Sequence, residues 1–296
     1  MRRRLLIALG VIVALAAGYV GVQFSRFVSV ETIKIDDHFY VMLGGGGNTA
    51  VLIADDGVLV VDTKFWSAGR RLPSLIKSIT DKPVKVIINT HYHSDHTHGN
   101  PNYPRGTDVI AQRRTRQHLI ELDKSFWESE PAWSLLPGDL VDEERELHFG
   151  DETIRIFHPG RGHTDGDVVV YFSKRHILHT GDLFLHNMYP FIDLRGGGSA
   201  LEWPATLDRV LAVPDVAQYI PGHGPLSTRA DVERFQAYLR SLLSQVQGLA
   251  GAAKSLSEIQ AAVDLHAYDD FTGTPFFTSR DKDIQWVYEE LTAKKK

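Results

Sequence analysis

The chain has 296 residues, of which 43% are hydrophobic and 23% charged, an ordinary globular composition that excludes a disordered or fibrous protein. The formal net charge is −5, and an acidic chain is a poor electrostatic partner for phosphate, so we expect no nucleic-acid partner. Cysteine is absent, which excludes disulfides, thiolate zinc sites and cysteine nucleophiles, whereas the 14 histidines are an unusually high count.

The N-terminus has the pattern of a targeting segment. Residues 2–4 are arginines, and an almost wholly apolar run follows from Leu5 to Val22. Residues 14–16 match a cleavage pattern for a signal peptide, but a run of this length is also enough to cross a bilayer uncleaved. We therefore expect residues 1–25 to be a signal peptide or an N-terminal membrane anchor. The body, residues 26–296, is then exported to the periplasm or the outer face of the inner membrane, with membrane contact only through this segment.

The first half of the body alternates strands with turns and one helix. Apolar runs predict strands over residues 27–35, 39–43, 48–54, 58–61 and 84–89. Asp56-Gly57 between two of these runs predicts a hairpin. The four glycines at 44–47 also predict a turn, because they lack the Lys-Ser/Thr and the following helix of a phosphate-binding loop. Apolar residues at helical spacing predict a helix over 68–79.

The second half repeats this alternation and adds helices. The pattern predicts strands over 153–157, 168–172, 177–180 and 217–220, and helices over 200–213, 228–248, 257–263 and 282–291. Residues 125–144 are rich in Trp, Pro and charge without periodicity, which predicts a surface insertion near the site. Strands alternating with helices indicate the α/β class, and no Pro/Gly/Ser-rich linker divides the body.

The clearest chemical signal is the run His91-Tyr92-His93-Ser94-Asp95-His96, directly after an apolar strand. Side chains alternate in an extended segment, so His91 and His93 project to the same side, with Asp95 and His96 just beyond. Four ligand-type side chains within six residues at the end of a buried strand indicate a metal site that could serve two ions.

Three further residues fit the same site. His163, Asp182 and His223 each lie beside glycine, close to the end of a predicted strand. A single histidine or aspartate in such a place is more often a cap or turn residue. Loops at the carboxyl ends of strands converge, however, and one cluster followed by His, Asp and His is a specific order.

From Asn48 through Pro225, this order and these motifs resemble the metallo-β-lactamase-fold hydrolase superfamily. The resemblance implies a four-layer αβ/βα sandwich with the site at one edge between two sheets, followed here by a helical C-terminal extension. It implies that His91, His93 and His163 bind one zinc ion, that Asp95, His96 and His223 bind a second, and that Asp182 bridges the two. Asp62 matches the family's first motif and is expected to orient the histidine loop.

The same resemblance implies a zinc-dependent hydrolase. A hydroxide shared by two zinc ions would attack an ester, lactone, thioester or amide carbonyl in a small molecule, with Asp95 and Asp182 in catalytic roles. In having Asp182, the chain resembles the glyoxalase II and lactonase-like branches of the superfamily. No glutathione-binding pattern is recognisable in the C-terminus, however. His186 and Tyr189 follow Asp182 closely and are candidates for contacting substrate.

Three alternatives stay open at this point. Asp182 points away from β-lactamase activity without excluding it. Iron in the same ligand set would give an oxidative enzyme resembling persulfide dioxygenases, and a metal-binding accessory protein of the cell envelope is the third possibility. Metal content separates hydrolysis from oxidation, because zinc favours hydrolysis and iron favours oxidation.

Overall fold

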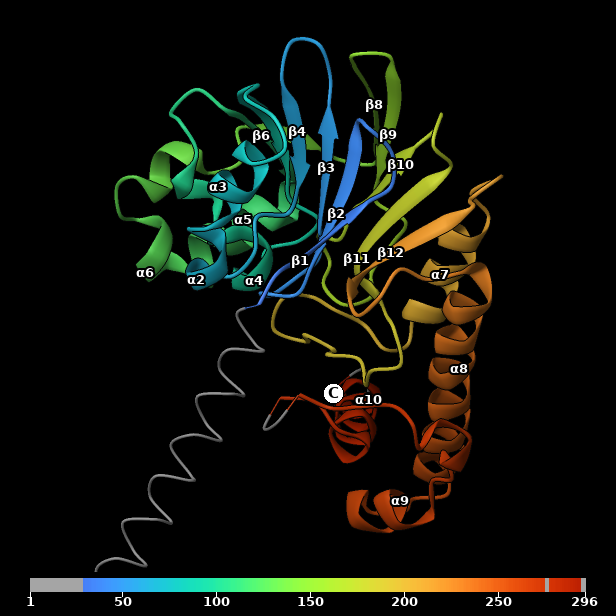
Figure 1. The fold of residues 1–296 in the computed structure, drawn as a ribbon. Helices are drawn as coiled ribbons and strands as arrows, with labels where there is room; N and C mark the ends of the chain where they lie inside the picture. The colour runs from blue at the N-terminus through green and yellow to red at the C-terminus, as the bar shows by residue number, and fades with distance from the viewer. Residues whose placement is uncertain (1–28, 275–276, 294–296) are drawn as a thin grey trace, which may run out of the picture.

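Two β-sheets packed face to face form the centre of the protein (Figure 1). The structure is a computed structural model that describes residues 29–274 and 277–293, so the leader predicted over residues 1–25 lies outside the described residues. The larger sheet has seven strands in chain order: β1 (Glu31–Lys34), β2 (Phe39–Leu43), β3 (Thr49–Ile53), β4 (Val58–Val61), β5 (Val84–Ile88), β6 (Asp108–Gln112) and β7 (Asp139–Val141). The smaller sheet has five strands in the spatial order β12 (Gln218–His223), β11 (Ile177–Leu185), β10 (Val169–Phe172), β9 (Glu152–Phe157) and β8 (Glu144–Phe149).

Helices cover the outer face of each sheet. The larger sheet is covered by α2 (Trp66–Gly69), α3 (Leu72–Lys77), α4 (Ser94–Thr97), α5 (Arg113–Glu121) and α6 (Lys124–Trp127), with the short 3-10 turns η1 (Asn100–Asn102) and η2 (Ala132–Leu135). The smaller sheet is covered by α7 (Trp203–Leu211) and α8 (Arg229–Gly251), and α9 (Leu256–Ala262), η3 (His266–Tyr268) and α10 (Arg280–Ala293) follow. The layers run helix, sheet, sheet, helix, which confirms the predicted four-layer αβ/βα sandwich.

Burial on both faces explains why the central strands are apolar throughout. In β3, Ala50 and Leu52 point into the core between the sheets, whereas Val51 and Ile53 point to the layer packed against α3. A strand that is covered on both sides needs apolar residues at every position rather than at alternate ones. The hairpin predicted at Asp56-Gly57 is present, because β3 and β4 pair antiparallel.

Three local predictions were wrong. The helix predicted over 68–79 is broken into α2 and α3, because Pro73 is placed at the start of α3, where its missing N–H is tolerated. Residues 125–144 are not a surface insertion: Trp127 is fully buried, and β7 pairs in parallel with β6. β11 continues to Leu185, so Asp182 lies inside a strand, at an irregularity in its pairing with β12.

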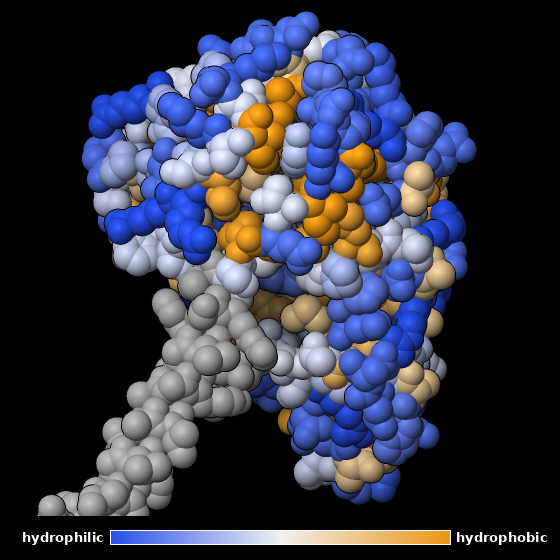
Figure 2. Space-filling model, in the orientation of Figure 1, coloured by the Kyte–Doolittle hydropathy of each residue, from blue (hydrophilic) through white to orange (hydrophobic). Residues whose placement is uncertain are grey.

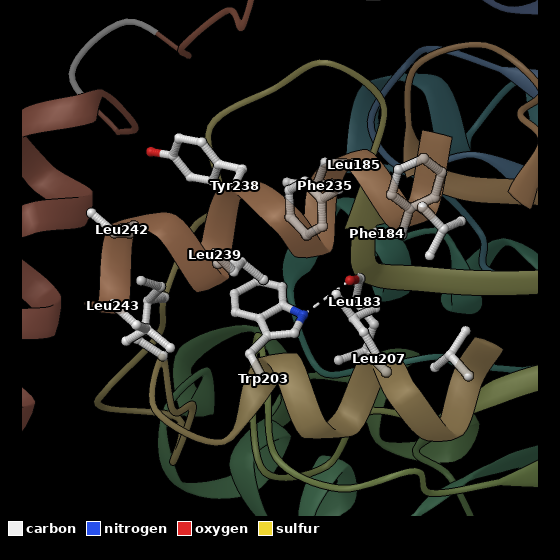
Figure 3. Packing of buried hydrophobic residues seen from close by; sticks show 14 of the residues in the cluster. Leu183, Phe184, Leu185, Trp203, Leu207, Phe235, Tyr238, Leu239, Leu242 and Leu243 are labelled. Atoms are coloured by element: carbon white, nitrogen blue, oxygen red, sulfur yellow. Dashed lines mark hydrogen bonds between the residues drawn. The ribbon is translucent and has the colours of Figure 1, made fainter. Parts of the chain in front are cut away.

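The C-terminal helices pack onto the smaller sheet through a large aromatic and aliphatic cluster (Figure 3). Trp203 at the start of α7 is fully buried there, and its indole N–H donates to the Leu183 carbonyl of β11 (3.0 Å). α8 begins with a capping box between Thr228 and Asp231, which satisfies N–H groups that the first turn leaves free. In the part of the chain that the structure describes, no helix has the length and hydrophobicity needed to span a bilayer.

Replacing Trp203 should strongly destabilise the fold. Trp203→Ala removes a fully buried indole and leaves a cavity, so we expect a loss of about 3–5 kcal/mol in the free energy of unfolding. Urea denaturation measures the loss. Trp66→Ala is the matched control, since Trp66 is 47% exposed, and should stay within about 0.5 kcal/mol of the parent. Equal losses in the two variants would contradict the packing described.

Candidate metal centre

The seven ligand-type residues predicted from the sequence converge where loops of both sheets meet. The larger sheet supplies residues just after β5, and the smaller sheet supplies residues from the loop between β9 and β10, from β11 and from the end of β12. The residues form two groups, His91, His93, His163 and Asp182 in one and Asp95, His96 and His223 in the other. Within each group, one ligand atom from every residue lies within 4.8 Å of the others, which is close enough to surround a metal ion.

In the first group, two histidine nitrogens face each other at short range. His163 Nε2 lies 2.8 Å from His93 Nδ1. His163 uses its other nitrogen to donate to the Phe191 carbonyl (2.6 Å), and His93 uses its other nitrogen to donate to the Asp193 carboxylate (3.0 Å). In the neutral imidazoles both facing atoms therefore carry lone pairs, an arrangement that a cation would stabilise.

In the second group, carboxylate oxygens lie among the histidine nitrogens. Asp95 Oδ2 is 3.1 Å from His223 Nε2 and 3.7 Å from His96 Nε2. Asp182 reaches both groups: its Oδ1 lies 3.1 Å from His96 Nε2, and its Oδ2 lies 3.7 Å from His163 Nε2. The Asp182 side chain thus stands between the two groups, with one oxygen turned to each.

Three buried ligand atoms make no hydrogen bond within the part of the chain that the structure describes. They are His91 Nε2, His96 Nε2 and Asp182 Oδ1. Two of them, His96 Nε2 and Asp182 Oδ1, face each other at 3.1 Å, whereas His91 Nε2 has no polar partner among the described residues, a burial that costs about 1–3 kcal/mol. Imidazole nitrogens and carboxylate oxygens are suitable ligands for a divalent metal ion, and the donor set therefore fits one.

Burial keeps two histidines of the first group neutral. Burial, followed by the neighbouring histidines, holds the pKa of His91 well below its ordinary value. The same burial, together with His93, lowers the pKa of His163 to about 4. A neutral imidazole has a free lone pair, so these side chains can ligate a metal at neutral pH without first losing a proton.

The second group has the opposite electrostatics. Burial by itself would lower the pKa of its histidines, but the Asp182 and Asp95 carboxylates, joined at His96 by Asp62, outweigh it. They raise the pKa of His223 to about 9 and that of His96 well above its ordinary value. In return, His223 and His96 hold the pKa of Asp182 well below its usual range, although burial opposes them. A metal ion entering this group would therefore displace protons.

Asp62 lies beneath the second group and fixes one of its rings. This fully buried carboxylate accepts from His96 Nδ1 (2.6 Å), from the Thr90 amide (2.8 Å) and from the Thr90 hydroxyl (2.7 Å). Because Nδ1 of His96 donates to Asp62, Nε2 is the nitrogen left to face the cluster. A carboxylate behind a ligating histidine sets its tautomer and ring orientation.

A second carboxylate behind a histidine was not predicted from the sequence. Asp193, in the loop after β11, accepts from His93 Nε2 and also from the Tyr92 hydroxyl. The hydrogen bonds from His93 and Tyr92 keep the pKa of Asp193 low despite its burial. Tyr92 and Asp193 therefore fix the orientation of the His93 ring, as Thr90 and Asp62 fix that of His96.

One sequence signal could have pointed to Asp193. Three glycines follow it at 196–198, and the Gly196 amide donates to Asp193 Oδ1 (3.0 Å). A Cβ atom at Gly196 would lie 2.5 Å from Asp193 Oδ2 and 2.7 Å from a ring carbon of Tyr92. Only glycine leaves room for this contact, so the glycine run marks a place where backbone and carboxylate pack tightly.

The tetraglycine turn is held by a buried lysine. Lys64 Nζ donates to the carbonyls of Met42 (2.8 Å), Gly44 (2.7 Å) and Gly47 (3.0 Å), and three acceptors match the three N–H groups of the ammonium. Burial lowers its pKa, and the Asp62 and Asp95 carboxylates partly oppose this. A Cβ at Gly47 would lie 2.2 Å from the His96 ring, so the turn packs directly against the cluster.

The two substrate candidates lie beside the cluster rather than in it. His186 Nδ1 contacts the Ser227 hydroxyl (2.9 Å), and its amide donates to the His223 carbonyl (3.2 Å). The Tyr189 ring packs against Tyr238 and Phe271 of the C-terminal segment.

Two other histidines face away from the metal-ligand groups. His98 pairs with Asp123 (2.6 Å) and stacks on Phe126. His179 donates through Nε2 to the Asn48 carbonyl and accepts at Nδ1 from the Gly181 amide, a packing role.

Comparison with known proteins gives consistent matches. The family model of the metallo-beta-lactamase superfamily matches residues 43–223, more than half of the chain. The 2,4-dinitroanisole O-demethylase subunit alpha of Nocardioides sp. is 27% identical over 84% of this chain and 71% of its own length. The metallo-beta-lactamase type 2 of Bacillus cereus is 26% identical over 62% of this chain and 68% of its own. The sec-alkylsulfatase Pisa1 of Pseudomonas sp. shares the fold with a TM-score of 0.74 at 16% identity, over 88% of this chain and 50% of that protein.

Removing the negative charge of Asp193 should weaken metal binding. In Asp193→Asn the His93 ring loses the carboxylate that fixes it, and changes behind a ligating histidine typically cost about 10–100-fold in metal affinity. Competition with a chromogenic chelator measures this affinity. Asp123→Asn is the matched control, because Asp123 contacts His98 outside the cluster. Unchanged affinity in Asp193→Asn, or an equal loss in the control, would contradict the role assigned to Asp193.

Proposed function

Because the chain belongs to the metallo-beta-lactamase superfamily of metal-dependent hydrolases, we propose that it binds two zinc ions and hydrolyses an ester, lactone, thioester or amide bond in a small molecule. The observation that carries the proposal is the position of Asp182, whose two oxygens face two separate groups of ligand-type side chains. We expect neither a nucleic-acid partner nor a polyanionic substrate, since the chain is acidic.

The proposed ligand sets follow the two observed groups. His91, His93 and His163 would hold one ion, Asp95, His96 and His223 the other, and Asp182 would contribute to both. When bound, two such ions supply Lewis acidity and lower the pKa of a bound water to about 7, which provides a nucleophile at neutral pH.

The protein's own residues orient the ligands and leave one side open. Asp62 and Asp193 fix the His96 and His93 rings by hydrogen bonds to their distal nitrogens. The side chains of Asp95 and His223 are 28% and 26% exposed, so a substrate carbonyl would approach the centre from their side. Asp95 is thus the carboxylate placed to meet both substrate and metal, which supports a catalytic role for it beside Asp182.

Esters and lactones rank first among the substrates. The position of Asp182 between the groups suits the lactonase-like ligand set, and the resemblance offers no glutathione-binding pattern for thioesters. β-Lactam cleavage is the second candidate, favoured by the similarity to the metallo-beta-lactamase type 2 of Bacillus cereus. If the protein binds iron rather than zinc, we expect an oxidative enzyme instead of a hydrolase.

The basic and apolar sequence at the N-terminus supports export of the body. A periplasm-active reporter fused after Gln23 should be active in a bacterial host. Activity of a cytoplasm-dependent reporter at the same junction, with none from the periplasmic one, would contradict export.

A substrate panel tests the reaction. Zinc-loaded protein should hydrolyse aryl esters and lactones with a kcat/KM well above that for β-lactams and phosphodiesters, because the centre supplies both electrophile and nucleophile for acyl transfer. Chelated protein is the blank and should be inactive. Efficient β-lactam cleavage without ester or lactone turnover would reverse the ranking, and activity that survives chelation would refute a metal hydrolase.

Changing Asp182 tests the bridging position. Asp182→Asn keeps the size of the side chain but removes its charge, so the protein should retain its melting temperature within a few degrees, bind the second metal more weakly and lose at least about 100-fold in kcat. Metal analysis after gel filtration and ester kinetics give the two readouts. Wild-type turnover with full metal content in Asp182→Asn would refute the placement of Asp182 between two ions.

A further inference from the structure

Solvent reaches the candidate metal centre mainly at three of its side chains. The His91, His96 and His163 side chains are fully buried, whereas His93 is 17%, Asp95 28% and His223 26% exposed. Figure 2 shows the surface hollowed between the sheets and the C-terminal helices, near the path of the loop after β11 in Figure 1. A substrate that approaches the centre past His93 would therefore contact side chains of the loop after β11.

Phe191 lines the loop beside the first ligand group. Its ring centroid lies 5.5 Å from that of His93 and 5.9 Å from that of His163. Its carbonyl accepts from His163 Nδ1 (2.6 Å), which fixes the position of this residue relative to the ligands. The Phe191 side chain is only partly buried, so part of its apolar surface is available for contact.

Trp286 of α10 extends this apolar surface. The Trp286 and Phe191 rings meet edge to face, with centroids 5.3 Å apart, and Trp286 is also only partly buried. α10 is anchored on both sides of Trp286: Asp283 accepts from the Tyr238 hydroxyl (2.5 Å), and Glu290 accepts from the Ser199 hydroxyl (2.5 Å). These hydrogen bonds fix the helix that carries Trp286 to the body, and Trp286 lies beyond residue 223, where the family match ends.

We propose that Phe191 and Trp286 form an apolar wall at the opening of the metal centre, and that the substrate carries an alkyl or aryl group beside the bond that is cleaved. This inference rests on the proposed hydrolase function and narrows its substrate class. Two aromatic rings that stay partly exposed next to an otherwise polar cluster would gain most by covering hydrocarbon surface, since burial of apolar area is favourable in proportion to the area.

Carboxylates of increasing chain length probe the wall directly, because they resemble the acyl product and can anchor at the metal centre. The test is to measure, by calorimetry, the affinity of zinc-loaded protein for each carboxylate from acetate to octanoate. One fully buried methylene is worth about fourfold in affinity. A chain that lies against a single wall should gain about twofold per methylene in the wild type, and this gain should disappear in Trp286→Ala and in Phe191→Ser. Both variants should retain their zinc.

Trp133→Ala is the matched control, since Trp133 of η2 is 51% exposed and is not part of the proposed wall; it should keep the wild-type gain. If Trp286→Ala disturbs the packing of α10, Phe191→Ser alone tests the proposal. No chain-length dependence in the wild type, or equal weakening of acetate and octanoate in the variants, would overturn the proposal. A chain-length dependence without turnover of any ester, lactone, thioester or amide would support the wall and contradict the proposed reaction, so the two failures are distinguishable.

Discussion

Seven histidine and aspartate side chains share a small, mostly buried volume where loops of both sheets meet. In their neutral forms and without a cation, His93 and His163 turn lone pairs toward each other, and Nε2 of His91 has no hydrogen-bond partner among the described residues. Protons on the second group offset part of this cost, as the raised pKa of His223 shows. A divalent metal ion would offset it more fully, because it satisfies several donors at once.

The surrounding fold is arranged to keep these groups in place. Asp62 and Asp193, one from each sheet's loops, hold ring orientations from behind, and Lys64 anchors the glycine turn that packs on His96. Trp203 ties α7 to β11, and its ring lies 6.1 Å from that of His163. The same packing that stabilises the smaller sheet therefore also positions a ligand loop, which couples stability to the geometry of the centre.

Much of this could be predicted from the sequence, because the decisive signals were local. Strands β2 and β4 have the bounds that their apolar runs predicted, and the histidine run follows a buried strand as expected. Asp193 was missed because its partner His93 lies 100 residues away and its loop has no periodicity. The contact between Trp286 and Phe191 was missed for the same reason: it arises from tertiary packing of a C-terminal helix, which no local pattern encodes.

We propose that two groups of side chains, joined by Asp182, hold two metal ions. Anomalous diffraction at the zinc absorption edge, from crystals of the zinc-loaded protein, tests it most directly. We expect two peaks, one among His91, His93 and His163 and one among Asp95, His96 and His223, with Asp182 in contact with both. A single peak, or zinc bound only elsewhere on the surface, would contradict it.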